Sequence, residues 1–140
     1  MDNYYDSDLI NSLEGNIDFK ILLADNYYNL INNKFPFVGS KIDFSKLKDT
    51  QYKKLSIKNK IGDCIEFIDE VLQIDRIDLN QDVIYLGDSL TENVYSFSLK
   101  NLDKIIPYIL DIPQHHYILS EKMEWCIYIS FENYIEFGLR

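Results

Sequence analysis

The strongest constraint on the fold is an alternation of side chains near the C-terminus. Successive side chains of a β-strand point to opposite faces, so a period of two predicts a strand with one face buried. The apolar positions of this alternation are Trp125, Ile127, Ile129 and Phe131, and the positions between them are Cys126, Tyr128, Ser130 and Glu132. A tight turn at Glu132 and Asn133 then leads into a second strand from Tyr134 to Leu139. These residues therefore predict a hairpin that runs to the end of the chain.

A second hairpin is predicted earlier in the chain. The segment from Asp82 to Gly87 is apolar at both alternating sets of positions, which is typical of a fully buried central strand. A five-residue loop at positions 89–93 follows, and the segment from Val94 to Ser98 returns as the second strand.

One helix and one strand are predicted between the two hairpins. Ser98 is expected to cap a helix from Leu99 to Leu110, because serine side chains accept hydrogen bonds from helix N-termini. Pro107 should kink this helix or divide it into two short ones. Residues 115–120 add a strand, so the C-terminal half is predicted to have the order β-β-α-β-β-β.

The first 34 residues predict two helices, because many of their apolar positions recur at intervals of three to four. Gly15 should interrupt them, so that the second helix runs from Ile17 to Asn33. Pro36 and Gly39 then mark a loop.

Residues 41–60 show no clean period and are predicted to form a loop with a short helix, whose seven lysines form a solvated face. A helix is predicted to follow, because its apolar residues fall within one arc at helical spacing. These residues are Ile61, Cys64, Ile65, Ile68 and Leu72. The predicted fold class is α+β, with a helical N-terminal half packed against a largely antiparallel sheet.

The size and composition favour a single domain over residues 1–140, since 46% hydrophobic residues can build one core. The opening Met-Asp-Asn-Tyr-Tyr-Asp lacks the basic and apolar regions of a secretory signal. No apolar run approaches the roughly 20 residues of a membrane span. We therefore expect a cytoplasmic protein with no membrane partner, in which Cys64 and Cys126 are reduced core thiols.

The charge is strongly acidic and unevenly distributed. The formal net charge is −9, yet residues 41–60 contain seven lysines and two aspartates, whereas residues 61–90 contain eight acids and one arginine. Phosphate-backbone binding needs a basic face, so the overall balance argues against a nucleic-acid partner and favours a basic one. Aromatic residues interleaved with lysines at 44–60 are a weak contrary sign of single-strand binding.

The residues that could carry catalysis or bind metal lack the required spacing. His115 and His116 are adjacent on a predicted strand and should point to opposite faces, so they cannot easily ligate one ion. Cys126 lies within a hydrophobic strand, where a neutral structural thiol is favoured over a nucleophile. A small hydrolase would need a nucleophile beside one of the histidines. We therefore expect no enzymatic activity, no metal and no cofactor.

Residues 83–138 resemble bacterial immunity proteins of toxin systems such as contact-dependent growth inhibition. The segments that carry the resemblance are Ile84-Tyr-Leu-Gly-Asp88, the helix from Leu99 to Leu110, Ile112-Pro-Gln-His-His-Tyr117, Trp125-Cys126 and Glu132-Asn-Tyr-Ile-Glu-Phe-Gly138. The resemblance implies a cytoplasmic protein that binds and occludes the toxic domain of an effector, often a nuclease. It implies structural roles for the residues Pro-Gln-His-His-Tyr.

An acidic surface would suit such a partner, because nuclease domains tend to be basic and opposite charges speed association. The candidate partner-binding residues are Asp63, Glu66, Asp69, Glu70, Asp75, Asp78, Asp88 and Glu92. Asp63, Glu66 and Glu70 should lie opposite the apolar arc of their helix. The same charges could instead keep the protein soluble. The alternative function is a non-catalytic adaptor or regulatory subunit unrelated to toxins.

Overall fold

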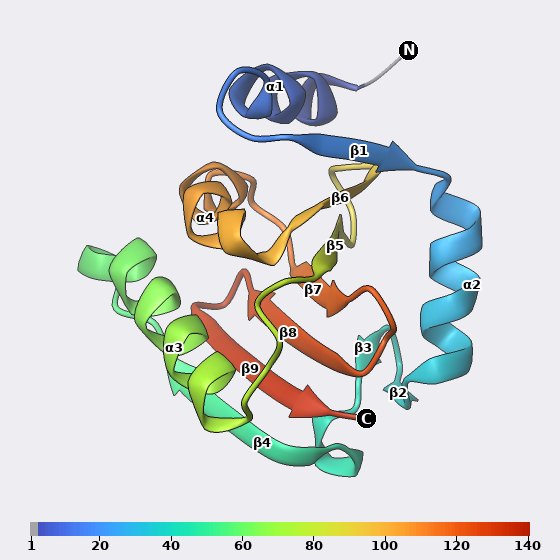
Figure 1. Ribbon diagram of the computed structural model, residues 1–140, viewed down its shortest axis with the longest axis vertical. Coiled ribbons are helices and arrows are strands. Elements are labelled where there is room, and N and C mark those ends of the chain that lie inside the picture. The colour runs from blue at the N-terminus through green and yellow to red at the C-terminus, as the bar shows by residue number, and fades with distance from the viewer. Residues whose placement is uncertain (1–2) are drawn as a thin grey trace.

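The structure is a computed structural model that describes residues 3–140 (Figure 1). Within these residues the chain forms four α-helices, nine strands and three short 3₁₀ helices. In chain order the elements are α1 (Tyr4–Leu13), β1 (Phe19–Leu22), α2 (Ala24–Lys34), β2 (Phe37–Val38), β3 (Lys41–Ile42), η1 (Phe44–Lys46), β4 (Lys48–Lys54), η2 (Ile57–Asn59), α3 (Lys60–Ile74), β5 (Asp82–Gly87), β6 (Val94–Ser98), η3 (Leu99–Asn101), α4 (Leu102–Leu110), β7 (His116–Ser120), β8 (Trp125–Ser130) and β9 (Tyr134–Leu139).

Seven strands form one sheet in the order β1-β6-β5-β7-β8-β9-β4, and each neighbouring pair is antiparallel. The short strands β2 and β3 form a separate hairpin. The predicted α+β class with a largely antiparallel sheet is therefore confirmed. From β5 onward the chain runs β5, β6, α4, β7, β8, β9, with η3 added before α4.

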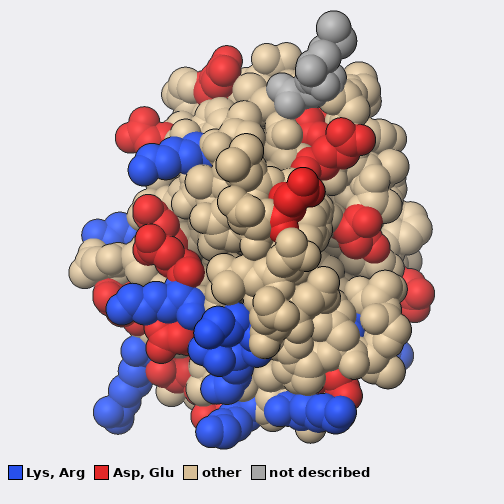
Figure 2. Space-filling view, turned by 90° about the vertical axis from the view of Figure 1, so that its right-hand side faces the viewer, with Lys and Arg blue, Asp and Glu red and all other residues tan. Residues whose placement is uncertain are grey.

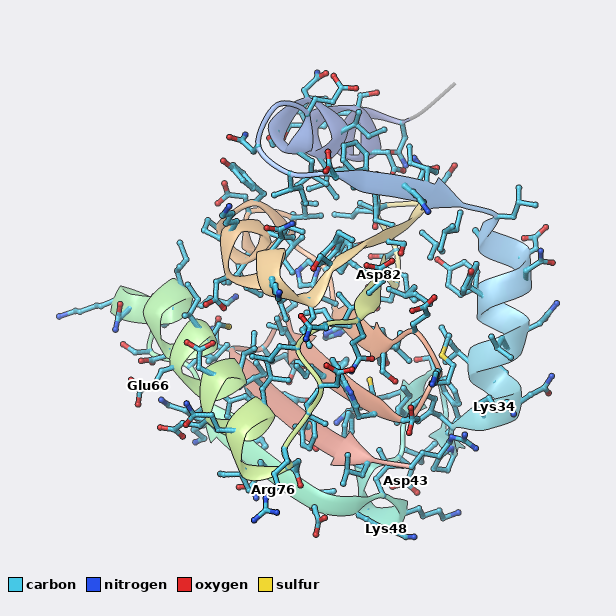
Figure 3. The ribbon with its side chains drawn as sticks, viewed as in Figure 1. Lys34, Asp43, Lys48, Glu66, Arg76 and Asp82 are labelled. Atoms are coloured by element: carbon cyan, nitrogen blue, oxygen red, sulfur yellow. The ribbon has the colours of Figure 1, made fainter. Side chains whose placement is uncertain are left out.

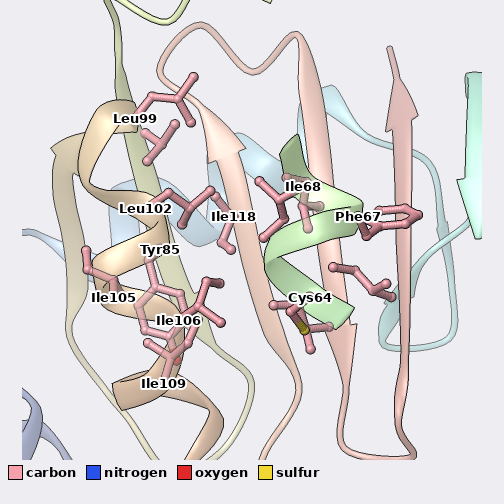
Figure 4. Packing of buried hydrophobic residues seen from close by; sticks show 14 of the residues in the cluster. Cys64, Phe67, Ile68, Tyr85, Leu99, Leu102, Ile105, Ile106, Ile109 and Ile118 are labelled. Carbon is pink, nitrogen blue, oxygen red and sulfur yellow. The ribbon is translucent and has the colours of Figure 1, made fainter. Parts of the chain in front are cut away.

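Three helices cover one face of the sheet. Leucines of α1 and apolar residues of α3 and α4 pack against inward-pointing sheet residues such as Tyr85 and Ile118. Figure 4 shows Cys64 and Ile68 of α3 and Ile106 of α4 among these contacts. This main core forms because the apolar arcs of the helices match the alternate residues of the buried strands.

The other face is covered by α2, the β2–β3 hairpin and η1 (Figure 1). Ile31 of α2 and Ile42 of β3 pack with the residues that alternate with those of the main core, including Leu86, Tyr117 and Cys126. The sheet is therefore the middle layer of three. Cys64 and Cys126 are buried free thiols, as predicted, and they belong to the cores on opposite faces.

The predicted helix from Ile17 to Asn33 is wrong over its first part. Residues 19–22 form β1, which pairs with β6, and the helix begins only at Ala24. Ile17, Phe19 and Ile21 alternate with polar residues, so this short segment has the period of a strand. Hydrogen bonding to β6 decides between the two patterns.

The prediction of a loop with a short helix over residues 41–60 also requires correction. These residues contain β3, η1 and η2, and they contain β4, the edge strand that pairs with β9. All residues of β4 except Lys53 are exposed, so burial imposes no period on its sequence. The N-terminal half therefore contributes both edge strands of the large sheet and is not wholly helical.

Three local predictions, two from the C-terminal half and one from α3, require correction. Both faces of β8 are buried, because helices cover one side and α2 with its hairpin covers the other. Phe131 follows the end of β8 and is 56% exposed, and Ile61 in the first turn of α3 is 43% exposed. Trp125 is buried as expected.

Helix α4 continues through Pro107 from Leu102 to Leu110, so the expected division into two helices does not occur there. Ser98 occupies the capping position of η3, but its side chain makes no capping hydrogen bond.

Candidate functional site

The loop that joins β5 to β6 lies at the centre of the candidate site. Residues 88–93 are called the hairpin loop below, and its side chains Asp88, Ser89 and Glu92 are exposed. Two candidate acids, Asp88 and Glu92, lie in it. The loop begins at the last residue of the segment Ile84 to Asp88, on which the resemblance to immunity proteins partly depends.

Gln114 holds the first half of the hairpin loop. Its side chain is buried, and Oε1 accepts hydrogen bonds from the backbone N–H groups of Ser89 at 3.2 Å, Leu90 at 2.7 Å and Thr91 at 3.2 Å. Its Nε2 donates to Thr91 Oγ1 at 2.9 Å and to the Tyr85 hydroxyl at 3.3 Å. One buried amide thus satisfies three consecutive backbone donors, which would be costly to leave unpaired.

Gly87 makes room for this arrangement. A Cβ atom at position 87 would lie 1.9 Å from Gln114 Nε2, which is closer than real atoms approach. The glycine before Asp88 and the glutamine before His115 therefore form one packing unit.

Asp6 of α1 holds the second half of the hairpin loop. Its carboxylate is fully buried and accepts hydrogen bonds from Glu92 N at 2.7 Å, from Asn93 N at 3.3 Å and from the Tyr95 hydroxyl at 2.5 Å. Helix α1 is anchored beside it, because Asn3 caps the helix through Asp6 N and donates to Leu90 O at 2.9 Å. Five consecutive backbone N–H groups, residues 89–93, are thus fixed by two buried side chains.

The two histidines lie on opposite sides of the strand, as predicted. His116 is buried, and its Nδ1 lies 2.7 Å from the Tyr85 hydroxyl, which Gln114 also contacts. Burial lowers the pKa of His116 to about 3. His115 instead stacks on Tyr128, and its Nδ1 accepts a hydrogen bond from Phe131 N at 3.1 Å. Both rings therefore make contacts that support the strands.

Asp88 is tied to the same unit. Its Oδ1 accepts a hydrogen bond from His115 N at 3.0 Å and from the Ser89 hydroxyl at 3.3 Å. The side chain remains exposed, so its charge is held in one place while facing solvent.

A cavity of about 340 Å³ opens beside Asp88, between α2, the β2–β3 hairpin and the end of β5. The lining residues are Tyr28, Ile31, Asn32, Phe37, Gly39, Ser40, Leu86, Asp88 and Tyr117. The Tyr28 hydroxyl donates to Gly87 O at 3.3 Å, which joins α2 to the start of the loop. Burial raises the pKa of Tyr28, and the carboxylates of Asp6, Asp88 and Glu92 raise it further.

The four candidate acids of α3 lie elsewhere, on the helix that covers the opposite face of the sheet. Figure 3 shows Glu66 pointing outward from this helix. Glu66 forms an ion pair with Lys53 of β4 at 3.7 Å, and Asp63 is half-buried and accepts a hydrogen bond from Ser56 N at 2.8 Å. Asp63 is therefore engaged in a local hydrogen bond and is less exposed than Glu66. Asp69 and Glu70 are exposed.

Asp69 lies beside a carboxyl group of α4. Burial raises the pKa of Asp103, and the neighbouring Asp69 raises it further.

Asp75 and Asp78 follow the end of α3. Burial raises the pKa of Asp75, and Asp49 raises it further. Asp78 accepts a hydrogen bond from Asn80 N at 2.8 Å, which fixes a turn. The eight candidate acids therefore form at least two separate groups, one along α3 and one in the hairpin loop.

The basic side chains also have a preferred region. Seen from the α2 side, Lys and Arg gather toward the lower end of the molecule, and Asp and Glu extend through the middle and upper parts (Figure 2). Lys41 is half-buried and pairs with Glu136 at 2.7 Å, and its ammonium group lies 4.8 Å from the Tyr128 ring centre. The lysine segment is thus not uniformly a solvated face.

Sequence reasoning missed two residues of this site. Asp6 has no local signal, because its loop partners lie 86 and 87 residues away in the chain. Tyr28 was placed within a helix, but its contact with Gly87 depends on how α2 crosses the sheet. Gln114 belongs to the segment that carries the resemblance, and its role in holding the loop became visible only with the fold.

Within residues 3–140, no three His, Cys, Asp or Glu side chains are grouped as a metal ion would require. Among the same residues, no helix is both long and apolar enough to cross a membrane. No family model matches the chain, and a search of curated proteins found no match to its sequence.

Proposed function

We propose that this protein is an immunity protein, which binds the toxic domain of a cognate bacterial effector and neutralises it. The observation that carries the proposal is the hairpin loop, whose five consecutive N–H groups are held by Gln114 and Asp6. The loop presents the carboxylates of Asp88 and Glu92 to solvent beside a cavity. The same loop lies between segments that resemble immunity proteins.

A rigid acidic loop supports this function for two physical reasons. A loop that is already ordered loses little conformational entropy on binding, so more of the contact energy appears as affinity. Carboxylates at its surface attract a basic partner and speed association. A nuclease domain, which must bind phosphates, would offer such a basic surface.

The proposed mode of action is occlusion without catalysis. The protein would act in the cytoplasm of the cell that makes the toxin, and it would need no metal or cofactor. The histidines and cysteines support this proposal, because both rings are engaged in structural contacts and burial raises the pKa of the Cys64 thiol to about 12. A thiol with such a pKa is a poor nucleophile near neutral pH.

The test is protection of a bacterial host from the toxin. An immunity gene is expected to lie immediately downstream of its toxin gene, so the C-terminal domain encoded by the upstream gene is expressed from one promoter, and this protein from another. We expect the domain alone to arrest growth. This protein should rescue growth, and an unrelated acidic protein of similar size should not. An adaptor unrelated to toxins would not rescue growth, and that result would reject the proposal.

A further inference from the structure

We propose that the cavity beside Asp88 binds an arginine side chain that projects from the protein partner. The inference deepens the proposed function, on which its biological meaning rests, by naming the chemistry of the contact. It concerns the loop side of the molecule and gives the α3 acids no role.

The lining of the cavity combines aromatic rings with one carboxylate. Tyr28, Phe37 and Tyr117 supply the rings, and Asp88 is the one charged residue of the lining among residues 3–140. Cations bind over aromatic faces, and a planar guanidinium also stacks on them and pairs with a carboxylate through two hydrogen bonds. A volume of about 340 Å³ lies at the small end of ligand sites and suits one long side chain rather than a drug-sized ligand.

The charge around the cavity favours a cation. Asp88 and Glu92 lie in the adjoining loop, and Asp6 lies beneath it. The Tyr28 hydroxyl lies at the cavity wall. Burial is the largest cause of its raised pKa, and these three carboxylates raise that pKa further. An anionic group such as a phosphate would be repelled from the same position.

The walls of the cavity are already ordered by hydrogen bonds. Tyr28 is held by Gly87 O at 3.3 Å, and Asp88 is held by His115 N at 3.0 Å. Tyr117 is buried and packs in the same apolar cluster as Ile42. An incoming side chain would therefore meet a formed site and would not have to order it.

Arginine is favoured over lysine by the shape of the lining. Asn32 and Ser40 add polar residues to a wall that also contains three aromatic residues. A guanidinium has five N–H donors in a plane and is more weakly hydrated than an ammonium, so it can pair with these groups while stacking.

The experiment titrates N-acetylarginine methylamide into the isotopically labelled protein and follows backbone amide shifts by NMR. We expect millimolar binding with the largest shifts at Gly39, Ser40 and Asp88. The neutral analogue N-acetylnorleucine methylamide has a similar length without the charge and should bind at least about fivefold more weakly. Equal binding of the two compounds, or shifts centred on another surface, would overturn the proposal.

Matched variants locate the charge that matters. Asp88→Asn keeps an acceptor for His115 N but removes the charge, and should weaken arginine binding about fivefold. Glu92→Gln makes the same charge change on the same loop outside the lining and should have a smaller effect. A loss in Glu92→Gln that equals the loss in Asp88→Asn would contradict a site in the cavity.

The titration contains no toxin, so its outcome is separate from that of the growth test. Arginine binding without rescue of growth would keep the cavity site and reject the immunity function. Rescue of growth without arginine binding would keep the function and reject the cavity site.

Discussion

The acids of α3 and the acids of the hairpin loop carry the same charge but are held in different ways. Glu66 pairs with Lys53 of the edge strand β4, and Asp63 accepts a hydrogen bond from Ser56 N, which precedes η2. Asp88 and Glu92 instead project from a backbone that two buried side chains fix from below. The α3 acids lie on a helix whose other side is buried in the main core, whereas Asp88 borders a cavity.

The difference shows that counting acids does not locate an interface. On α3, part of the negative charge is already paired within the protein, as in the ion pair of Glu66 with Lys53. Exposed ion pairs of this kind contribute little to stability. In the hairpin loop, the buried side chains of Gln114 and Asp6 hold an exposed segment in place by hydrogen bonds. Buried polar side chains that order a surface loop point to a function for that loop.

Removing the amide that holds the loop is expected to have the largest effect. Gln114→Leu keeps the volume but leaves the N–H groups of residues 89–91 without their acceptor, so unfolding should become easier by about 3 kcal/mol. Chemical denaturation measures this change. Compared with the wild type, amide hydrogen exchange in the variant should become faster in the loop and stay unchanged in α3. Gln73→Leu, an exposed glutamine of α3, is the control and should change stability by less than about 0.5 kcal/mol. Equal losses in both variants would mean that the loop is not specially held.

Acid should destabilise the loop side of the molecule through His116. Burial holds the pKa of His116 at about 3, below its value of about 6.5 in an unfolded chain. The unfolded chain then binds a proton that the folded protein does not, so stability is full above about pH 6.5 and falls as the pH decreases toward about 3. Between about pH 6.5 and pH 5 the loss should be about 2 kcal/mol.

Urea unfolding at these two pH values measures the loss. His116→Gln should remove this part of the pH dependence, whereas His115→Gln, which retains His116, should keep it. An unchanged pH dependence in His116→Gln would show that this ring does not link acid to unfolding.

Neutralising the exposed acids of α3 should have the smallest effect on stability. Glu66→Gln with Glu70→Gln breaks one exposed ion pair at 3.7 Å and should change the free energy of unfolding by less than about 0.5 kcal/mol. Asp63→Ala should cost more, about 1 kcal/mol, because Ser56 N loses its acceptor. Thermal melting compares the variants. A larger loss in the double variant than in Asp63→Ala would reverse the distinction drawn within α3.

The sequence predicted the parts of the fold that burial imposes on local pattern. Strand β5 is fully buried as predicted, β8 and α3 form where their patterns predict a strand and a helix, and Trp125 is buried. The edge strand β4 was missed because it gains hydrogen bonds from β9 without burying its side chains. Residues 19–22 were misassigned because a four-residue strand gives a short signal within a helix-like pattern.

The candidate site was predictable only in part. Asp88 and Glu92 were candidates because they are acidic, and so were six other residues that the fold places elsewhere. Sequence spacing cannot separate these groups, because the bonds that fix the loop join Asp6 and Gln114 to residues more than 20 positions away. Long-range contacts of this kind appear only when the topology is known.

Association kinetics with the cognate toxin domain compare the two acidic regions most directly. Two double variants are compared. The loop variant combines Asp88→Asn with Glu92→Gln, and the α3 variant combines Glu66→Gln with Glu70→Gln. Each removes two negative charges, so both change the net charge equally. Stopped-flow mixing at low and high salt should show association about tenfold slower and less dependent on salt for the loop variant, with near wild-type rates for the α3 variant. Slower association in the α3 variant with an unaffected loop variant would place the interface on α3 and contradict the role given to the hairpin loop.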